Sequence, residues 1–183
     1  MRILALAAAL LLPIAAHAQC GGSFNSFKNE LKSEAVSKGI SAANASAFLS
    51  GVRQDGKVLK ADRAQGVFQK PFIEFSRRLI SSNRISSGRS NAKRFDRVFD
   101  NVESTYGVNR HVLLAFWAFE TDFGAFQGDF NTANALVTLA HDCRRPELFR
   151  PQVFAAMTLY ERGQFDPNRT TGAWAGEIGM VQM

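Results

Sequence analysis

Apolar residues recur at helical spacing along most of the chain. Phe24, Phe27, Leu31 and Ala35 form an apolar stripe that ends at Gly39. An apolar residue at every third or fourth position is typical of an amphipathic helix, whereas a half-buried strand alternates at every second position. The sequence contains no stretch of sustained alternation, so its pattern predicts an all-α fold. Two more short helices are expected, over 41–49 and, with Pro71 in its first turn, along Phe72, Phe75 and Leu79.

The second half of the chain carries stronger helix signals. Phe95, Val98, Phe99 and Val102 lie at i, i+3, i+4 and i+7 and predict a helix that stops at Tyr106-Gly107. Asn109 is then suited to cap the next helix, with Val108 and Leu113 as its hydrophobic staple. Two later helices are expected, one over 132–142 and one that starts at Pro146 or Pro151 and runs to Arg162. The segment 55–66 has no pattern that assigns it.

A basic segment, Ser76 to Arg94, lies between these two halves. It contains six arginines and lysines and no acidic residue: Arg77, Arg78, Arg84, Arg89, Lys93 and Arg94. Such a segment is either a basic rim that steers an acidic polymer into a cleft or a solvated surface loop, and the loop is the simpler interpretation.

The N-terminus has the features of a secretory signal peptide. Arg2 precedes an apolar run from Ile3 to Leu12, and Ala16-His17-Ala18 follows as a small-x-small cleavage site. The run is too short for a transmembrane helix. Because Gln19, which is not a small residue, precedes Cys20, we expect no lipid anchor. The mature protein, 19–183, is predicted to be a periplasmic or secreted domain without stable membrane insertion.

Composition narrows the class of partner. The 22 basic and 16 acidic residues give a net charge of +6, and since Arg2 belongs to the predicted signal peptide, the mature chain keeps +5. A basic protein favours polyanions. Outside the inner membrane the abundant anionic polymer is the cell wall, whereas nucleic acid is largely absent, so no nucleic-acid partner is expected.

The two cysteines and the scarce histidines bear on cross-links and cofactors. Cys20 and Cys143 are expected to form one disulfide in an oxidising compartment, closing a loop of more than a hundred residues. Only His111 and His141 remain after cleavage, and they do not lie at the spacing of a metal-ligand pair. We therefore expect neither a metal site nor a cofactor.

Glu120 is the strongest candidate for a catalytic group. It ends an apolar run, Val112 to Phe119, which predicts a helix buried all round. Apolar neighbours such as Phe116, Trp117 and Phe123 would desolvate the carboxylate, and the negative end of the helix dipole acts in the same direction, so the pKa of Glu120 is expected to be raised. A glycosidase-type general acid needs such a carboxyl group. Pattern alone also allows a solvent-exposed helix end, and Asp122 and Asp129 are alternative carboxylates nearby.

The residues around Glu120 resemble a known family. Tyr106-Gly107-Val108, followed by the run 114–124 with Trp117, Glu120-Thr121 and Phe123-Gly124, is similar to the catalytic block of the lytic transglycosylase B family. In that family a YGV turn leads into a helix ending in W-x-x-E-T-x-(Y/F)-G, whose Glu is the sole catalytic acid/base. The resemblance therefore implies this role for Glu120 and a lysozyme-like helical domain.

Two further blocks extend the resemblance to the end of the chain. The segment 135–150, with Arg144, Arg145 and Phe149, resembles the family's ALATLA-x-D, RR and FFR segment, and 172–182 resembles its G-S-(Y/F/W)-A-G-A-M-G-x-x-Q-F block. Trp174 and Gln182 thereby become candidate substrate-binding residues, together with Phe123. Ala173 stands where many members have a Ser, and Glu177 replaces a small residue. Because family members continue further, we expect the sequence to be C-terminally truncated.

The resemblance implies an enzyme that cleaves the MurNAc–GlcNAc β-1,4 bond of peptidoglycan and leaves a 1,6-anhydro end on the muramic acid. Three alternatives remain open at this point. A muramidase-type hydrolase would need Asp122 or Asp129 to hold a water molecule, a non-catalytic wall-binding protein or fragment would bind glycan without cutting it, and a helical secreted protein would do neither.

Overall fold

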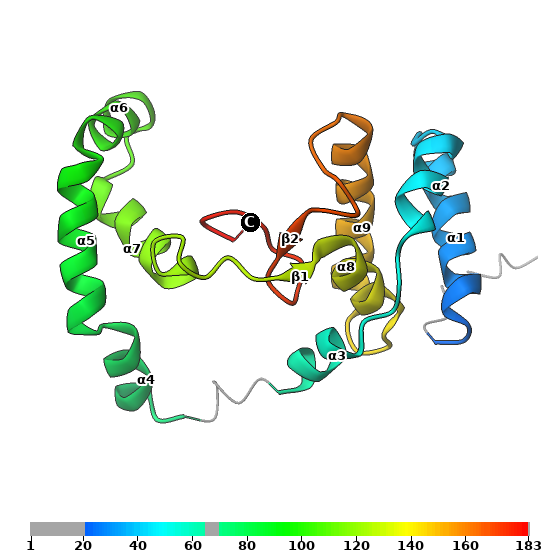
Figure 1. The fold of residues 1–183 in the computed structure, drawn as a ribbon, viewed down its shortest axis with the longest axis horizontal. Coiled ribbons are helices and arrows are strands. Elements are labelled where there is room, and N and C mark those ends of the chain that lie inside the picture. The colour runs from blue at the N-terminus through cyan, green and yellow to red at the C-terminus, as the bar shows by residue number, and fades with distance from the viewer. Residues whose placement is uncertain (1–20, 65–69, 183) are drawn as a thin grey trace, which may run out of the picture.

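The structure is a computed structural model that describes residues 21–64 and 70–182. The predicted signal peptide, 1–18, lies outside these residues. Within them the regular secondary structure is helical apart from one pair of two-residue strands (Figure 1). The elements are α1 (Phe24–Ser37), α2 (Ala42–Ser50), α3 (Gly56–Arg63), α4 (Phe72–Leu79), α5 (Ser82–Arg94), α6 (Asp96–Tyr106), α7 (Arg110–Thr121), β1 (Phe130–Asn131), α8 (Thr132–His141), α9 (Pro146–Glu161) and β2 (Thr171–Gly172).

Local signals set most helix ends. The side chain of Asn109 accepts a hydrogen bond from the backbone N–H of His111 at 2.9 Å and so caps α7, as expected. Ser41 caps α2 in the same way through Asn44. Gly107 ends α6 in the left-handed conformation, at φ 68°, which few residues other than glycine adopt. Pro146 rather than Pro151 occupies the first turn of α9, and Pro151 lies inside that helix.

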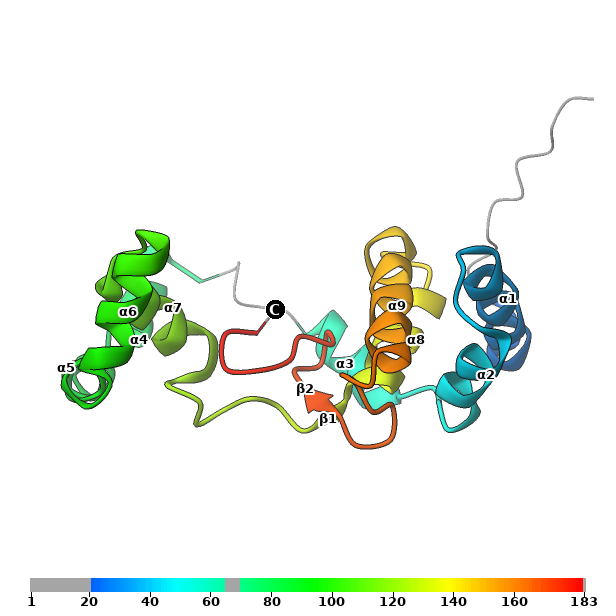
Figure 2. The same cartoon turned by 90° about the horizontal axis from the view of Figure 1, so that it is seen from above.

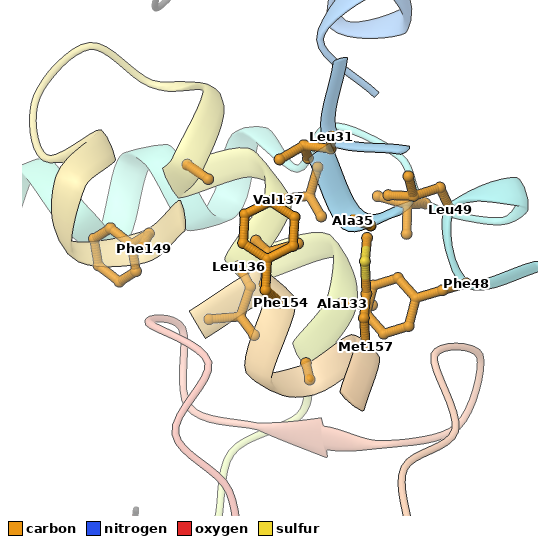
Figure 3. Packing of buried hydrophobic residues seen from close by; sticks show 14 of the residues in the cluster. Leu31, Ala35, Phe48, Leu49, Ala133, Leu136, Val137, Phe149, Phe154 and Met157 are labelled. Atoms are coloured by element: carbon orange, nitrogen blue, oxygen red, sulfur yellow. The ribbon is translucent and has the colours of Figure 1, made fainter. Parts of the chain in front are cut away.

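One group of helices, α1, α2, α8 and α9, holds the main core. Leu31, Phe48, Val137 and Met157 are among its fully buried side chains, and they come from all four helices (Figure 3). Helix α8 lies at the centre and packs most extensively on α9. Burial of these apolar side chains is the main stabilising contribution to the group.

The helices α4 to α7 form a second group on the other side of the molecule, with the β1–β2 pair and the C-terminal residues between the two (Figures 1 and 2). Helix α5 packs on α6 and α7. Arg84 of α5 forms an ion pair with Asp122, directly after α7, at 2.9 Å. Arg110 joins α7 to α6 through Asp96, Asp100 and Glu103. The hydrogen bonds to these carboxylates, that of Glu103 first, raise the pKa of Arg110.

The basic segment 76–94 is not a loop, so that interpretation of the sequence was wrong. It completes α4 and forms α5, whose first turn is capped by Ser81 through the backbone N–H of Arg84. Neither helix has a fully buried residue. Apolar side chains are too sparse in α5 to show a helical period in the sequence. Contacts with α6 and α7 stabilise α5 instead.

The expected burial of α7 was also wrong. Val112, Phe116 and Phe119 are all about half exposed, and only Leu114, Ala118 and Thr121 of this helix are buried. The helix that is buried on nearly every side is α8, where nine of ten residues are buried. Helix α8 is enclosed by α9, α3 and β1, whereas among the helices α7 packs mainly on α5 and α6.

Helix α3, which the sequence left unassigned, is attached to the core by the buried side chain of Val58 and by ion pairs. Asp62 is buried at 1% exposure and pairs with Arg144, at 2.6 Å, and with Arg145. Burial by itself raises the pKa of Asp62, but the hydrogen bonds from the two arginines outweigh it and the net pKa is lowered. Arg63 pairs with Asp142 at 2.7 Å on the outside of the same contact.

The N-terminal residues and the end of α8 meet at the same place. The backbone N–H of Gly21 donates to the carbonyl of His141, and the ring of His141 contacts Phe24 and Phe27 edge-on. Cys143 is disulfide-bonded, and its expected partner, Cys20, lies outside the described residues, so the pairing stays a prediction. No helix among the described residues is both long and apolar enough to cross a bilayer.

Candidate active site

Glu120 occupies the last turn of α7, immediately before an abrupt change of direction. Asp122 and Phe123 both have positive φ values, 50° and 60°, although neither is a glycine. Consecutive non-glycine residues in this region are uncommon and concentrate at functional sites. The turn carries the chain away from α7 towards β1 and leaves the Glu120 side chain at the helix end.

The side chain of Glu120 lines a hollow of about 790 Å³ between α6, α7 and the C-terminal residues. We call it the Glu120 hollow. Its lining is otherwise apolar or uncharged: Phe95, Val98, Phe99, Leu113, Phe116, Trp117, Met180, Val181 and Gln182. Glu120 is thus the one ionisable group among the residues that line it. An aromatic surface beside a single carboxyl group suits the apolar face and the linking oxygen of a sugar.

A C-terminal segment, residues 172–182, forms one wall of the hollow. The hydroxyl of Thr121 donates to the carbonyl of Met180 at 2.6 Å and accepts from the N–H of Gly124 at 2.9 Å. On the other side, Gly176 packs so closely on α8 that a Cβ atom there would overlap the side chain of Leu136. Pairing of Gly172 with Phe130 in the β1–β2 sheet fixes the start of the segment. The segment therefore connects the end of α7 to the core group.

Of the three candidate substrate-binding residues, only Gln182 lines the Glu120 hollow. Gln182 lines the Glu120 hollow, and its amide donates to the carbonyls of Gln127 and Gly179. Phe123 lies in a smaller hollow against α5, and its ring contacts Trp117 at 5.4 Å between centroids. Trp174 packs, partly buried, against the core and is not among the residues that line the Glu120 hollow. The structure thus brings together Glu120 and Gln182, with Phe123 behind Trp117.

The two alternative carboxylates lie outside the hollow. Asp122 is held by Arg84, and Asp129 is exposed on the connection to β1. Neither lines the Glu120 hollow. Among the described residues, no group of three or more His, Cys, Asp or Glu side chains could hold a metal ion.

Glu120 itself is exposed, so of the two environments that the sequence pattern allowed, the structure has the solvent-exposed helix end and not the buried one. The apolar residues around it, such as Phe116 at 58% exposure, are open to solvent on the same face of α7. The desolvation expected for Glu120 is thus absent from this structure. Filling the hollow with a ligand would supply it, since the ligand would displace water from the carboxyl group and its aromatic neighbours.

Thr121 holds the C-terminal segment in place, although its motif in the sequence indicates no role for it. It is 1% exposed, and its hydroxyl makes the contacts that hold the C-terminal segment against α7. The signal available in the sequence was a β-branched hydroxyl residue directly after the candidate acid. A threonine at this position can bond backbone groups locally and across the chain.

Thr121→Val should keep the shape of the side chain and remove both hydrogen bonds. Because the Met180 carbonyl and the Gly124 N–H then lose a partner, we expect a loss of about 2 kcal/mol in unfolding free energy and weaker binding in the Glu120 hollow. Denaturant unfolding and glycan binding would measure both effects. Thr121→Ser, which keeps the hydroxyl, should recover most of each, and equal losses in both variants would refute the role of the hydroxyl.

Several solved structures have the same fold as this chain. SltB3 from Pseudomonas aeruginosa, in complex with NAG-NAM-pentapeptide, is 29% identical with a TM-score of 0.82, over 89% of this chain and 44% of that one. SltB1 from the same organism is 26% identical with a TM-score of 0.73, over 85% and 53%. Escherichia coli Slt35, in complex with bulgecin A, is 21% identical with a TM-score of 0.76, over 95% and 57%. The chain therefore spans about half the length of these relatives.

These similarities define the class as an all-α, lysozyme-like lytic transglycosylase fold, which confirms the fold predicted from the sequence. A family model described as a transglycosylase SLT domain matches residues 23–183, and the chain belongs to that family. No curated protein sequence matches the chain significantly.

Proposed function

We propose that this chain is an enzyme that cleaves peptidoglycan glycan strands as a lytic transglycosylase, with Glu120 as its single acid/base. The observation that carries the proposal is the position of Glu120 as the one ionisable group lining an aromatic hollow. Membership of the transglycosylase SLT domain family and the similarity to SltB3, which was solved with a NAG-NAM-pentapeptide, support peptidoglycan as the substrate.

In the proposed reaction one carboxyl group acts twice. The protonated Glu120 donates its proton to the oxygen that links MurNAc to GlcNAc as the bond from C1 of MurNAc to that oxygen breaks. The substrate's own acetamido group supports the cationic centre. The carboxylate of Glu120 then takes the proton from the C6 hydroxyl while O6 bonds to C1, which leaves a 1,6-anhydro end. No water is consumed, so no second carboxylate is required.

The presence of only one carboxylate in the Glu120 hollow, among the residues that line it, favours a transglycosylase over a muramidase-type hydrolase. A hydrolase with a water-activating base uses a second carboxylate across the scissile bond. Asp122 is engaged with Arg84, and Asp129 lies outside the Glu120 hollow. Both positions therefore weigh against the hydrolase, although all three carboxylates lie within one short stretch of sequence.

The non-catalytic alternative depends on the C-terminal segment. Ala173 stands where the family pattern has a Ser, so a contact to the sugar that a hydroxyl would make is missing. The backbone N–H of Ala173 donates to the carbonyl of Glu177 at 2.8 Å, which keeps the local turn closed without the hydroxyl. The wall of the hollow is thus formed despite the substitution.

A peptidoglycan substrate implies that the protein acts outside the inner membrane. The predicted signal peptide, Met1 to Ala18, would supply the export and leave a periplasmic or secreted protein. Tracking the mature N-terminus by mass spectrometry would test cleavage after Ala18.

Product analysis decides between the proposed reactions. Purified sacculi are incubated with the protein, and the soluble products are examined by mass spectrometry. Products that end in 1,6-anhydromuramic acid support the transglycosylase, whereas reducing ends indicate a hydrolase. Sedimentation of the protein with sacculi, without release of any product, would instead identify a wall-binding protein.

A further inference from the structure

A second pocket lies on the opposite side of the C-terminal segment, between that segment and the helices α8 and α9. We call it the α9 pocket; its volume is about 420 Å³. Its floor is apolar, with Leu136 and Phe149 among the lining residues, and Figure 3 shows Leu136 at the side of the helices nearest β2. Gln182 lines both this pocket and the Glu120 hollow, so the two are adjacent.

Glu177 contributes the only acidic side chain among the residues that line the α9 pocket. It is half-buried, and it has no ion-pair partner among residues 21–64 and 70–182. Partial removal of a carboxylate from water is unfavourable unless a cation or a donor compensates for it. An unpaired carboxylate in this pocket would also repel the carboxylates of the proposed substrate. It therefore calls for a cationic partner on the ligand.

Arg145 also lines the α9 pocket and carries the charge opposite to that of Glu177. Arg145 and Arg144 share the single carboxylate of Asp62, so this cluster retains one positive charge. The Nε atom of Arg145 is buried and has no hydrogen-bond partner among the described residues. Thr132, 2% exposed, also lines the pocket, and its hydroxyl is likewise without a partner in the part of the chain that the structure describes.

A carboxylate, a guanidinium and an unpaired hydroxyl above an apolar floor match a zwitterion. Peptide stems of the cell wall carry free carboxylates and, where they are not cross-linked, a primary amine. We propose that the α9 pocket binds the primary ammonium of such a peptide stem, with Glu177 as its acceptor and Arg145 beside a neighbouring carboxylate. This inference rests on the proposed function, since it assumes that a glycan strand lies in the Glu120 hollow.

The proposal gives Glu177 a role in specificity. Cross-linking converts the primary amine of a stem into an amide, which carries no charge. Strands with uncross-linked stems should therefore bind more tightly than strands with cross-linked stems. A primary ammonium can also come from a de-N-acetylated glucosamine, but the guanidinium of Arg145 in the same pocket favours the peptide, which carries both charges.

Binding can be measured without cleavage by working in the Glu120→Gln background. Soluble, uncross-linked, peptide-bearing glycan strands are titrated calorimetrically before and after acetylation of their amines, which removes the ammonium and leaves the carboxylates. We expect acetylation to weaken binding about three- to fivefold, the contribution of one partly exposed ion pair. Adding Glu177→Gln should bring binding of the native strands to the acetylated level and abolish the difference.

Glu147→Gln is the matched control, because Glu147 lines a different pocket on α9, with Glu34 and Arg150. It should keep the full effect of acetylation. Peptide-free strands should bind equally well with and without Glu177→Gln. Thermal melting of each variant shows whether the fold is retained.

Three results would overturn the inference: no binding of any strand, an acetylation effect that persists in Glu177→Gln, or a dependence on Glu177 that appears only with de-N-acetylated, peptide-free strands. The first of these results would also count against the proposed function, whereas the other two concern the α9 pocket alone, because peptide-bearing strands still bind or the dependence on Glu177 has another source. If sacculi yield 1,6-anhydro products while Glu177→Gln changes nothing, only the role of the α9 pocket is wrong.

Discussion

The Glu120→Gln variant should lose release of 1,6-anhydromuropeptides by about 10³-fold, in the range that removal of a general acid/base usually costs. Gln has the size of Glu but can neither donate a proton to the leaving oxygen nor accept one from the C6 hydroxyl. Because Glu120 is exposed and has no ion-pair partner among the described residues, its replacement should leave the melting temperature unchanged. The measurement is the initial rate of product release from sacculi, followed by mass spectrometry.

Asp129→Asn is the matched control for this variant. Asp129 lies only nine residues further along the chain and is exposed, but it does not line the Glu120 hollow. Its replacement should therefore leave the rate largely unchanged. A Glu120→Gln variant with wild-type activity would refute the proposed function, and loss of activity in Asp129→Asn alone would revive the muramidase alternative.

Asp62→Asn should cost about 3 kcal/mol in unfolding free energy, at the lower end for removing one partner of a buried ion pair. Asp62 is buried and receives both Arg144 and Arg145, which would be left as two neighbouring positive charges. The partial exposure of the arginines keeps the cost at that lower end. Urea unfolding followed by circular dichroism measures the change.

Asp142→Asn tests whether burial is the reason. Asp142 pairs with Arg63 at 2.7 Å in the same contact, but Arg63 is about half exposed, so the loss should stay below about 1 kcal/mol. Equal losses in the two variants would show that burial of Asp62 is not what matters.

The pH dependence of stability should also report on Asp62. Its pKa is lowered in the folded state, so the unfolded chain binds the proton more tightly. The stabilisation is therefore fully present above the ordinary pKa of an Asp carboxyl group, near 4, and is lost as the pH falls through the lower folded value. The wild type should lose unfolding free energy below about pH 4 more steeply than Asp62→Asn, whereas identical curves would contradict the pairing.

Most helices could be predicted from the sequence because their signals are local. The stripe from Phe24 to Ala35 lies in α1, the capping residue Asn109 starts α7, and Gly107 ends α6. These signals act within one or two helical turns. Helix α5 was not predicted because it lacks such local signals. Its stabilising contacts, such as that of Arg84 with Asp122, join residues far apart in the sequence.

The candidate site could be predicted in part. Glu120 and Gln182 were singled out from the sequence, and the structure places both at the Glu120 hollow, although 62 positions separate them. Trp174, proposed from the same segment as Gln182, packs against the core instead. The positions of neighbouring residues relative to a cleft depend on how the segment turns, which the residue pattern does not specify.

The sequence by itself determined the all-α fold, the ends of most helices, the family and the identity of the candidate acid, because periodicity, capping and motif residues all act at short range or are matched directly. Tertiary structure alone decided which apolar helix became the centre of the core. Helices α7 and α8 both carry long apolar stretches, but α8 is enclosed by α9, α3 and β1, whereas α7 keeps an open face beside Glu120. Burial depends on what packs against a helix, and only the folded chain brings those partners together.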